Sequence, residues 1–332
     1  MKKQNNEKVF LIFNTACIGD ILINNALCQN IKHFYPDSKI VFIVNPAYKD
    51  VALYMKDVDD VVFFDRKKDN NLKSCIKFLK NFPYKKPYAS FVIYANDRNL
   101  IFSKLLGAKH IVSHAKNLLR FLHTKEPYKM NEYVHMKDKC SALIEPLTGK
   151  SIKNLPIIYN TDNVTTKIVE KIKELTKQKE VIAICPFSNF VLKDMPVDVT
   201  AELIEKLNKT GKTVLLLGAG DVARKYSANL KKRGCLNFID LVDATNFQEL
   251  AAVLQSIKAL ISVDTGAMHF ANAVRCPVVD IFYSYSTDID TADLWAPDSN
   301  LYPAITIKDN QTADNIIEKL NLLLAEGRNH AG

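Results

Sequence analysis

Residues able to carry out chemistry stand directly after the first apolar run of the chain, which spans 9–13. Gly19-Asp20 follows this run and precedes a helical pattern. Gly19 permits a tight turn or a close backbone approach. Asp20 can act as a general base that takes a proton from an attacking hydroxyl. The same carboxylate can instead cap the first turn of the helix, and the local sequence leaves both interpretations open.

A second polar motif reads Asp-Thr-Gly-Ala-Met-His over 264–269, between an apolar run and a helical pattern. Free backbone N–H groups at a helix start bind phosphate, Thr265 adds a hydroxyl, and Gly266 lets a ligand approach the backbone. Asp264 can accept hydrogen bonds from sugar hydroxyls, and His269 lies about one turn into the helix. In the alternative interpretation Asp264 or Thr265 only caps the helix, and His269 belongs to the core.

Two further loops follow predicted strands of the second half. Lys193 lies in the first of them and can pair with a diphosphate, although an exposed loop lysine is the simpler interpretation. The second loop, 218–223, reads Gly-Ala-Gly-Asp-Val-Ala and matches the G-x-G-x-x-A dinucleotide fingerprint, with Asp240 and Asp243 about 20 residues further on. It therefore predicts, as an alternative, an oxidoreductase that uses NAD(P). The loop follows the second strand of its domain, whereas the fingerprint belongs after the first.

The elements that position these motifs alternate between short apolar runs and amphipathic stretches, which is typical of α/β domains with parallel sheets. The 332 residues suit two such domains, and the pattern restarts after a polar segment at 160–166. We expect two Rossmann-like domains that face a cleft, over 1–165 and 166–332. Thr245-x-x-Gln248 predicts a capping box, and a last helix at about 312–324 could pack back on the N-terminal domain.

Composition limits the function classes. No run is long enough to span a bilayer, and no signal peptide is evident, so we expect a cytoplasmic protein. The seven cysteines show no CxxC and no metal-type spacing, so we expect neither a metal site nor a disulfide framework. The net charge of +9 favours anionic partners. The basic residues gather at Arg66, Lys67 and Lys68 and along 104–139, without any nucleic-acid-binding signature.

At these motifs the chain resembles glycosyltransferase family 9, the ADP-heptose:lipopolysaccharide heptosyltransferases. The resemblance rests on four segments, Cys-Ile-Gly-Asp at 17–20, the Asp-Thr-Gly motif at 264–269, Cys-Pro-Val-Val at 276–279 and Trp-Ala-Pro at 295–297. It covers both ends of the chain and most of the second half, while about 100–180 shows no match. The resemblance implies a GT-B fold, inversion at the anomeric carbon and no required metal or other cofactor.

The resemblance also implies roles for individual residues. Asp20 would be the base. Lys193, Thr265 and Gly266 would hold the diphosphate of a nucleotide sugar, expected to be ADP-heptose. The rest of the donor would contact Asp264, His269, Asp221 and Gly218. An anionic lipopolysaccharide inner-core acceptor would contact Gly19, Arg66, Lys67, Lys68, Arg98 and Arg120, with peripheral contact to the inner membrane surface.

The sequence departs from the family pattern at four places. Cys17 replaces a serine, and Asn14 stands where a basic residue is common. Met195 replaces an aromatic residue after Lys193, and Tyr283-Ser284 replaces a Gly-Pro. Three alternatives follow: transfer of another sugar on the same fold, the NAD(P)-dependent oxidoreductase, and a non-catalytic saccharide-binding scaffold.

Overall fold

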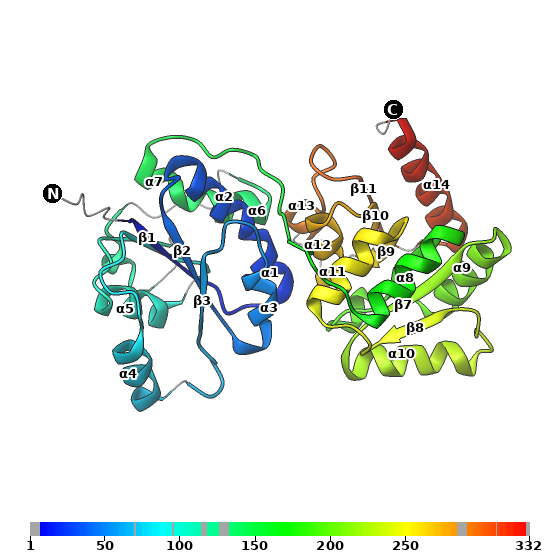
Figure 1. Cartoon of the computed structure of the whole chain (residues 1–332), viewed down its shortest axis with the longest axis horizontal. Coiled ribbons are helices and arrows are strands. Elements are labelled where there is room, and N and C mark those ends of the chain that lie inside the picture. Colours follow the sequence, from blue (N-terminus) through cyan, green and yellow to red (C-terminus); the bar gives the residue numbers. More distant parts are fainter. Residues whose placement is uncertain are drawn as a thin grey trace. The chain divides into compact units, whose positions relative to one another are not determined.

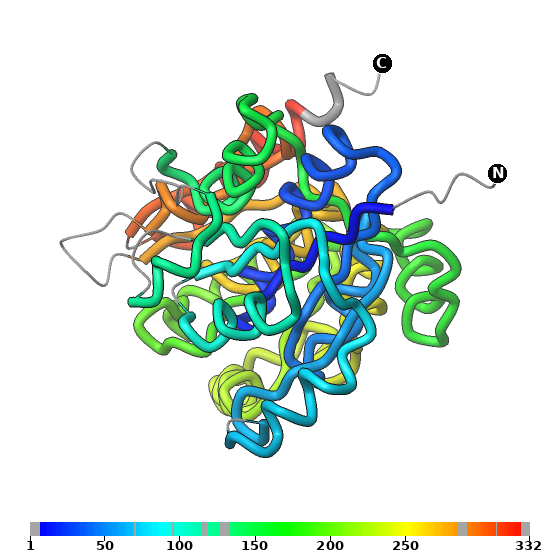
Figure 2. The backbone as a smooth tube through the Cα atoms, turned by 90° about the vertical axis from the view of Figure 1, so that its left-hand side faces the viewer, coloured from blue at the N-terminus to red at the C-terminus, as the bar shows by residue number. Residues whose placement is uncertain are grey.

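The computed structural model describes residues 7–69, 71–94, 96–113, 118–125, 133–283, 291–309 and 311–329 (Figure 2, where the other residues are grey). The chain divides into two compact units between Ile157 and Ile158. The sequence placed this boundary between 165 and 166, because the polar segment at 160–166 looked like the linker. In the structure Tyr159 already belongs to unit 2, since its backbone N–H donates to the Ala273 carbonyl at 3.1 Å.

Unit 1 contains one parallel sheet of five strands in the order β3-β2-β1-β4-β5 (Figure 1). Its strands are β1 (Val9–Phe13), β2 (Lys39–Val44), β3 (Asp60–Phe63), β4 (Ala89–Val92) and β5 (His110–Ser113). Its helices are α1 (Ile18–Ile23), α2 (Asn25–Phe34), α3 (Lys49–Leu53), α4 (Leu72–Asn81), α5 (Asp97–Leu105), α6 (Met136–Ser141) and α7 (Glu145–Thr148), with 3₁₀ turns at Pro46–Tyr48, Arg120–Leu122 and Ala142–Ile144.

Unit 2 contains a parallel sheet of six strands in the order β11-β10-β9-β6-β7-β8 (Figure 1). Its strands are β6 (Val181–Cys185), β7 (Thr213–Gly218), β8 (Ile239–Val242), β9 (Ala259–Val263), β10 (Val278–Phe282) and β11 (Ala304–Lys308). Its helices are α8 (Lys167–Gln178), α9 (Val197–Lys209), α10 (Gly220–Lys232), α11 (Phe247–Ser256), α12 (Gly266–Ala273), α13 (Thr291–Trp295) and α14 (Ala313–Asn329), with a 3₁₀ turn at Val191–Lys193.

The central strands form the cores of both units. β6, β9 and β10 are buried along their whole length, as expected of parallel strands covered on both faces. In unit 1 the apolar cluster around Leu11 and Phe13 of β1 extends to Val41 of β2 and Val92 of β4. The predicted α/β class with parallel sheets is confirmed in both units.

One local prediction needs correction, the position of the capping box before α11. The capping box of α11 is Asn246-x-x-Glu249, one residue after the predicted position, because the amide side chain of Asn246 accepts the Glu249 N–H at 2.9 Å and Glu249 returns the bond. The last helix, α14, packs on α9 and β10 of its own unit. Its apolar face covers the sheet of unit 2, and Asp314 at its start pairs with Lys206 of α9 at 2.5 Å.

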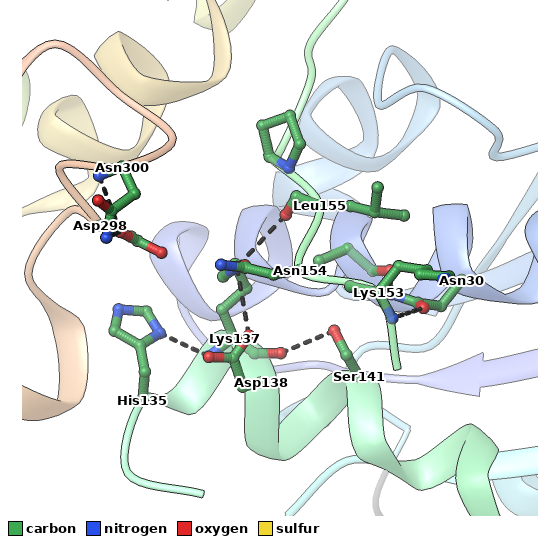
Figure 3. Close-up of polar contacts among 12 residues, drawn as sticks. Asn30, His135, Lys137, Asp138, Ser141, Lys153, Asn154, Leu155, Asp298 and Asn300 are labelled. Atoms are coloured by element: carbon green, nitrogen blue, oxygen red, sulfur yellow. Dashed lines mark hydrogen bonds and ion pairs between the residues drawn. The ribbon is translucent and has the colours of Figure 1, made fainter. Parts of the chain in front are cut away.

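The end of unit 1 is held by side chains of α2 and α6 (Figure 3). Asn30 accepts the Lys153 N–H at 2.8 Å and donates to its carbonyl at 3.1 Å. Lys137 is 3% exposed, and its ammonium group donates to Asn154 and, at 3.3 Å, to the Leu155 carbonyl. A buried ammonium group needs such partners, so these contacts fix the path of the chain before it enters unit 2.

Candidate functional site

In both sheets the strand order reverses at one place, and polar side chains follow the strands on either side of it. In unit 1 this switch point lies between β1 and β4, and in unit 2 it lies between β6 and β9. Ligands of open α/β sheets bind outside the carboxyl ends of the strands at such a point. Asp20 follows β1 and Tyr94 follows β4, whereas Lys193 follows β6 and Asp264 follows β9.

The carboxylate of Asp20 accepts hydrogen bonds through both of its oxygens at the switch point of unit 1. One oxygen accepts the Cys17 N–H at 3.2 Å, which closes the first turn of α1 as a capping box. The other oxygen accepts a hydrogen bond from the Tyr94 hydroxyl. The capping role anticipated from the sequence is therefore present. It leaves room for a second role, because one carboxylate can accept several hydrogen bonds.

Tyr94 is a residue that sequence reasoning missed. Its backbone has a φ of 63°, a left-handed conformation that costs a residue with a side chain about 1–2 kcal/mol. Burial raises the pKa of the Tyr94 hydroxyl, and the charges of Cys140 and Asp20 raise it further, so the hydroxyl remains a donor. The signal for this contact was a polar residue at the end of a strand, but only the pairing of β4 with β1 turns it toward Asp20.

The loop that carries Asp20 is held by Asn14, which is 1% exposed. The Asn14 side chain accepts the Ala16 N–H and donates to the Asp20 carbonyl, both at 3.0 Å. Asn24 also donates to that carbonyl. Gly19 lies in the first turn of α1. These bonds account for Asn14 at a position where the family commonly has a basic residue.

Three of the predicted acceptor-binding residues form the turn after β3. Arg66, Lys67 and Lys68 are all exposed, and the Asp65 carboxylate accepts the backbone N–H groups of Lys67 and Lys68 at 2.9 and 3.3 Å. Asp65 thus shapes the turn while the three cationic side chains project into solvent.

Arg98 of α5 lies near this turn. Its guanidinium group stacks over the Phe64 ring at 4.5 Å. Burial lowers the pKa of Arg98, and the charge of Arg66 lowers it further, so the two cations act on each other. Burial raises the pKa of the Tyr48 hydroxyl. Cys17 and Asp20 raise this pKa further, whereas the charge of Arg66 lowers it. Tyr48 therefore lies within the electrostatic reach of both the basic turn and Asp20.

Arg120 is an exposed residue of the 3₁₀ turn after β5. This turn packs on α5, and the Leu119 N–H donates to the Asp97 carboxylate at 2.9 Å. Arg98 is thus linked to Arg66 by charge, and its helix also contacts the turn that carries Arg120. Within the basic stretch 104–139, residues 114–117 and 126–132 lie outside the described residues, as does Ser284 of the departure at 283–284.

An ion pair spans the switch point of unit 2. The Lys193 ammonium group lies 2.5 Å from a carboxylate oxygen of Asp264, and the two side chains are 19% and 11% exposed. Asp194, a residue not singled out from the sequence, accepts the Ser188 N–H at 2.7 Å and so shapes the lysine loop. Met195 is 1% exposed, and the Tyr226 hydroxyl donates to its carbonyl at 2.6 Å. The methionine is thus an internal anchor of the loop.

The N-terminus of α12 is open beside this ion pair. Thr265 is its N-cap residue, but the Thr265 side chain makes no capping hydrogen bond. Among the described residues, no acceptor receives the backbone N–H groups of Gly266 or Ala267. The alternative in which Asp264 or Thr265 caps this helix is therefore wrong. Such an open start beside a cation suits an anionic ligand.

His269 lies in the first turns of α12, 5% exposed, with its ring edge-on to Trp295 at 6.3 Å. The structure thus places His269 largely in the core, as the second interpretation of the motif anticipated.

The N-terminus of α10 is occupied instead. The Gly220 N–H donates to the Asp243 carboxylate at 2.7 Å, and Arg224 pairs with both Asp243 and Asp221. A Cβ on Gly218 would lie 2.2 Å from the Phe187 ring, so this glycine is needed for packing. The loop at 218–223 also follows β7, away from the switch point. These features argue against dinucleotide binding here.

Among the described residues, no group of three or more His, Cys, Asp or Glu side chains is arranged to hold a metal ion. None of the helices that the structure describes has the length and apolar character needed to cross a membrane.

Comparison with known proteins agrees with these features. Residues 101–316 match the family model of glycosyltransferase family 9 (heptosyltransferase). The matched region includes the segment at about 100–180 that showed no resemblance by motif, and it begins after Asp20. Lipopolysaccharide heptosyltransferase 3 of Escherichia coli strain K12 is 22% identical over 284 residues, which cover 80% of this chain and 79% of that protein.

Solved structures show the same fold. The family 9 glycosyltransferase from Veillonella parvula DSM 2008 superposes with a TM-score of 0.82 at 15% identity, over 96% of this chain and 98% of that one. The E. coli heptosyltransferase WaaC, solved with ADP-2-deoxy-2-fluoro heptose, gives a TM-score of 0.74 at 16% identity, over 95% and 99%. The two parallel α/β units therefore have the GT-B architecture expected from the sequence. With a family model that matches most of its length, this chain belongs to glycosyltransferase family 9, the heptosyltransferases, and is a heptosyltransferase-like glycosyltransferase.

Proposed function

We propose that the protein transfers heptose from ADP-heptose to an anionic saccharide of the lipopolysaccharide inner core, with inversion and without a metal ion. One observation carries the proposal: the open N-terminus of α12 lies beside the Lys193–Asp264 ion pair at the switch point of unit 2. The solved relative that holds an ADP-heptose analogue and the lipopolysaccharide heptosyltransferase relative support the donor and the acceptor class.

The donor diphosphate would bind at α12. Lys193 and the N–H groups of Gly266 and Ala267 together supply one positive charge and a helix start without a capping side chain. Both favour the leaving diphosphate as its charge grows, which is how fixed donors accelerate such reactions without a cation. Thr265 adds a hydroxyl next to these groups. Asp264, released from Lys193 by the diphosphate, would accept hydrogen bonds from the donor sugar.

The exposed Asp221 and the packed Gly218 belong to the start of α10, which follows β7 and not a strand of the switch point. A nucleoside role for them, and one for His269, remains part of the proposal on the strength of the family resemblance alone.

Asp20 would act as the general base. An acceptor hydroxyl oxygen attacks the anomeric carbon, the bond from that carbon to the diphosphate oxygen breaks, and ADP leaves with the bonding electrons. The hydroxyl proton passes to a carboxylate oxygen of Asp20. Because the attack comes from the face opposite to the leaving group, a single displacement inverts the anomeric configuration. The Tyr94 hydroxyl and the Cys17 N–H orient the carboxylate for this transfer.

The acceptor would meet the basic turn of unit 1. Arg66, Lys67 and Lys68 project into solvent from this turn. The charges of Arg66 and Asp20 both shift the pKa of Tyr48, so the turn and Asp20 act on the same residue. Phosphates and carboxylates of an inner-core glycolipid are the anions such a cluster attracts. Arg98 would support the cluster from α5. Arg120, in the turn that packs on α5, would meet another anionic group of the glycolipid or the anionic membrane surface.

Calorimetric titration with ADP, UDP and NAD in parallel, without added metal, tests the donor site. We expect ADP to bind and UDP and NAD to bind much more weakly. A preference for UDP would keep the transferase and change the donor, whereas tight NAD binding would restore the oxidoreductase.

Turnover of ADP-heptose with a lipopolysaccharide inner-core acceptor, followed in EDTA, then tests the reaction itself. Release of ADP that depends on the acceptor and persists in EDTA is the expected result. ADP binding without any such turnover would favour the non-catalytic saccharide-binding scaffold.

A further inference from the structure

A carboxyl group lies in the middle of the unit 2 core, where no role has been assigned to it. Asp280 belongs to β10, whose other residues are apolar, and its side chain is completely buried. Neither carboxyl oxygen has a hydrogen-bond partner among the described residues. Buried polar groups are nearly always paired, and an unpaired one destabilises the fold. A group that weakens the core in this way calls for an explanation.

The sheet register places Asp280 directly behind the donor site. Asp280 is paired in register with Ser262 of β9 on one side and with Thr306 of β11 on the other. Side chains two residues apart along a strand point to the same face, so Asp264 follows Ser262 on the face that carries Asp280. Diagonal neighbours of this kind have Cα atoms about 7–8 Å apart.

Charge connects Asp280 to the ion pair. Burial raises the pKa of Asp280 well above its usual range, the charge of Asp264 raises it further, and Lys193 lowers it. The nearby Ile281 N–H also lowers it without making a hydrogen bond of normal geometry. The neutral form is thus favoured, because a buried, unpaired carboxylate is unstable.

Among the described residues, the other elements around β10 add few titratable groups. The face of α14 that packs on the sheet is apolar, with Ala313, Ile316 and Leu320 buried, and α12 contributes His269. The in-register neighbours of Asp280, Ser262 and Thr306, carry no charge. Asp264 and Lys193 are therefore the charges that a change of state of Asp280 would affect most directly.

We infer that Asp280 is a positioning residue of the donor phosphate site, and that as a neutral acid it keeps Lys193 available to a diphosphate. This inference rests on the proposed function. With Asp280 neutral, no charge on β10 reinforces the hold of Asp264 on Lys193, and an arriving diphosphate can draw the ammonium group away. An ionised Asp280 adds a second negative charge behind the pair, which holds Lys193 back and repels the diphosphate.

The consequence is a link between protonation and donor binding. A bound diphosphate favours the neutral form of Asp280, so the affinity for ADP decreases as the pH rises and Asp280 begins to ionise. Consider one charge on Asp280 and one on the bound diphosphate, about 8 Å apart at an effective dielectric constant of about 20. Their repulsion changes the affinity for ADP by roughly 30-fold. An asparagine has nearly the same shape and cannot ionise, so Asp280→Asn removes this loss.

The experiment measures the Kd of ADP by calorimetry between pH 6 and 9.5 for the wild type, Asp280→Asn and Thr306→Val. Thr306→Val is the matched control, because it removes a polar group next to Asp280 without removing a titrating one. We expect the wild type and Thr306→Val to lose at least about tenfold more affinity over this range than Asp280→Asn. Ionisation of ADP itself affects all three proteins equally. Asp280→Ser provides a second neutral variant if Asp280→Asn does not fold.

Thermal unfolding supplies an independent readout. The folded state raises the pKa of Asp280, so Asp280 costs no stability below the unfolded carboxyl pKa of about 3.9 and destabilises the fold as the pH rises above it. Asp280→Asn should therefore melt at a higher temperature than the wild type at pH 7, and this advantage should vanish near pH 4.

Each outcome separates the two proposals. Parallel pH profiles of ADP binding in the wild type and Asp280→Asn would overturn the inference and leave the donor site standing, even if the melting temperature changed. A wild type that does not bind ADP at any pH would overturn the proposed donor and the inference with it.

Discussion

The starts of α10 and α12 look alike in sequence and differ in structure. Each follows a buried strand of the same sheet and begins at a glycine. At α10 the Gly220 N–H is occupied by the Asp243 carboxylate, whereas at α12 no described side chain occupies the first N–H groups, and Lys193 lies beside them.

Strand order explains the difference. α12 follows β9 at the switch point, where the loop after β6 brings a lysine, and α10 follows β7, where the neighbouring β8 brings an aspartate. A helix start in such a sheet is a ligand site only where its neighbours leave it open. The start of α1 is a third case, because its capping carboxylate, Asp20, lies at a switch point.

The largest expected effect separates the two capping carboxylates. Asp20→Asn should lower turnover by roughly 100-fold or more, because a positioned base contributes at least that much. Asp243→Asn should leave turnover unchanged. The measurement is the steady-state rate of ADP release by both variants and the wild type, with circular dichroism to verify folding. If Asp20→Asn loses only a few-fold in turnover, Asp20 is not the general base and its role is to cap α1.

The next effect concerns the open helix start. Lys193→Ala should weaken ADP binding by roughly 10- to 100-fold, since a hydrogen bond to a charged group contributes about 1.5–3 kcal/mol. The matched control is Lys231→Ala, which breaks the ion pair of Lys231 with Asp240 (2.6 Å) in the same unit. Calorimetric Kd values of ADP compare the two variants. Equal affinities in both would exclude Lys193 from the donor site.

A smaller effect tests the partner of Asp20. Tyr94→Phe should lower turnover by roughly tenfold, because it removes a hydrogen bond that orients the carboxylate, while ADP affinity stays constant. Tyr84→Phe removes another tyrosine–aspartate bond of unit 1, from Tyr84 to Asp60, and should not affect turnover. If both variants turn over at the wild-type rate, Tyr94 has only a structural role.

The smallest effect tests the occupied helix start. Asp243→Ala should lower the melting temperature by a few degrees without changing ADP affinity, because it removes a helix cap. The Gly220 N–H and then Arg224 lower the pKa of Asp243, so this stabilisation is present above the unfolded pKa of about 3.9 and is lost as the pH falls through the folded value. Tighter ADP binding by Asp243→Ala would show that α10 can also accept phosphate.

The periodicity of the chain was sufficient to predict most strands that carry the motifs. The apolar runs at 181–185, 259–263 and 278–282 predict strands, and β6, β9 and β10 lie there, since a buried parallel strand is a short, continuous apolar run. β5, β8 and β11 were not predicted. They lie at the sheet edges or begin with partly exposed residues, so their apolar pattern is weak.

The candidate site was predicted only in part, and the missing residues share one property. Tyr94 and Asp194 each act on a group that lies elsewhere in the chain, Tyr94 on the Asp20 carboxylate and Asp194 on the Ser188 N–H. Local patterns describe the residue itself and say little about what it will contact.

By itself, the sequence determined the fold class, the family and the positions of Asp20, Lys193 and the motif at 264–269, because short-range hydrophobic periodicity and short motifs are encoded in neighbouring residues. Only the tertiary structure decided which helix start stays open, which carboxylate becomes a cap and that Asp280 lies behind an ion pair. The physical reason is that strand order and register join residues far apart in the chain, and these neighbours set the charge and hydrogen bonding of each site.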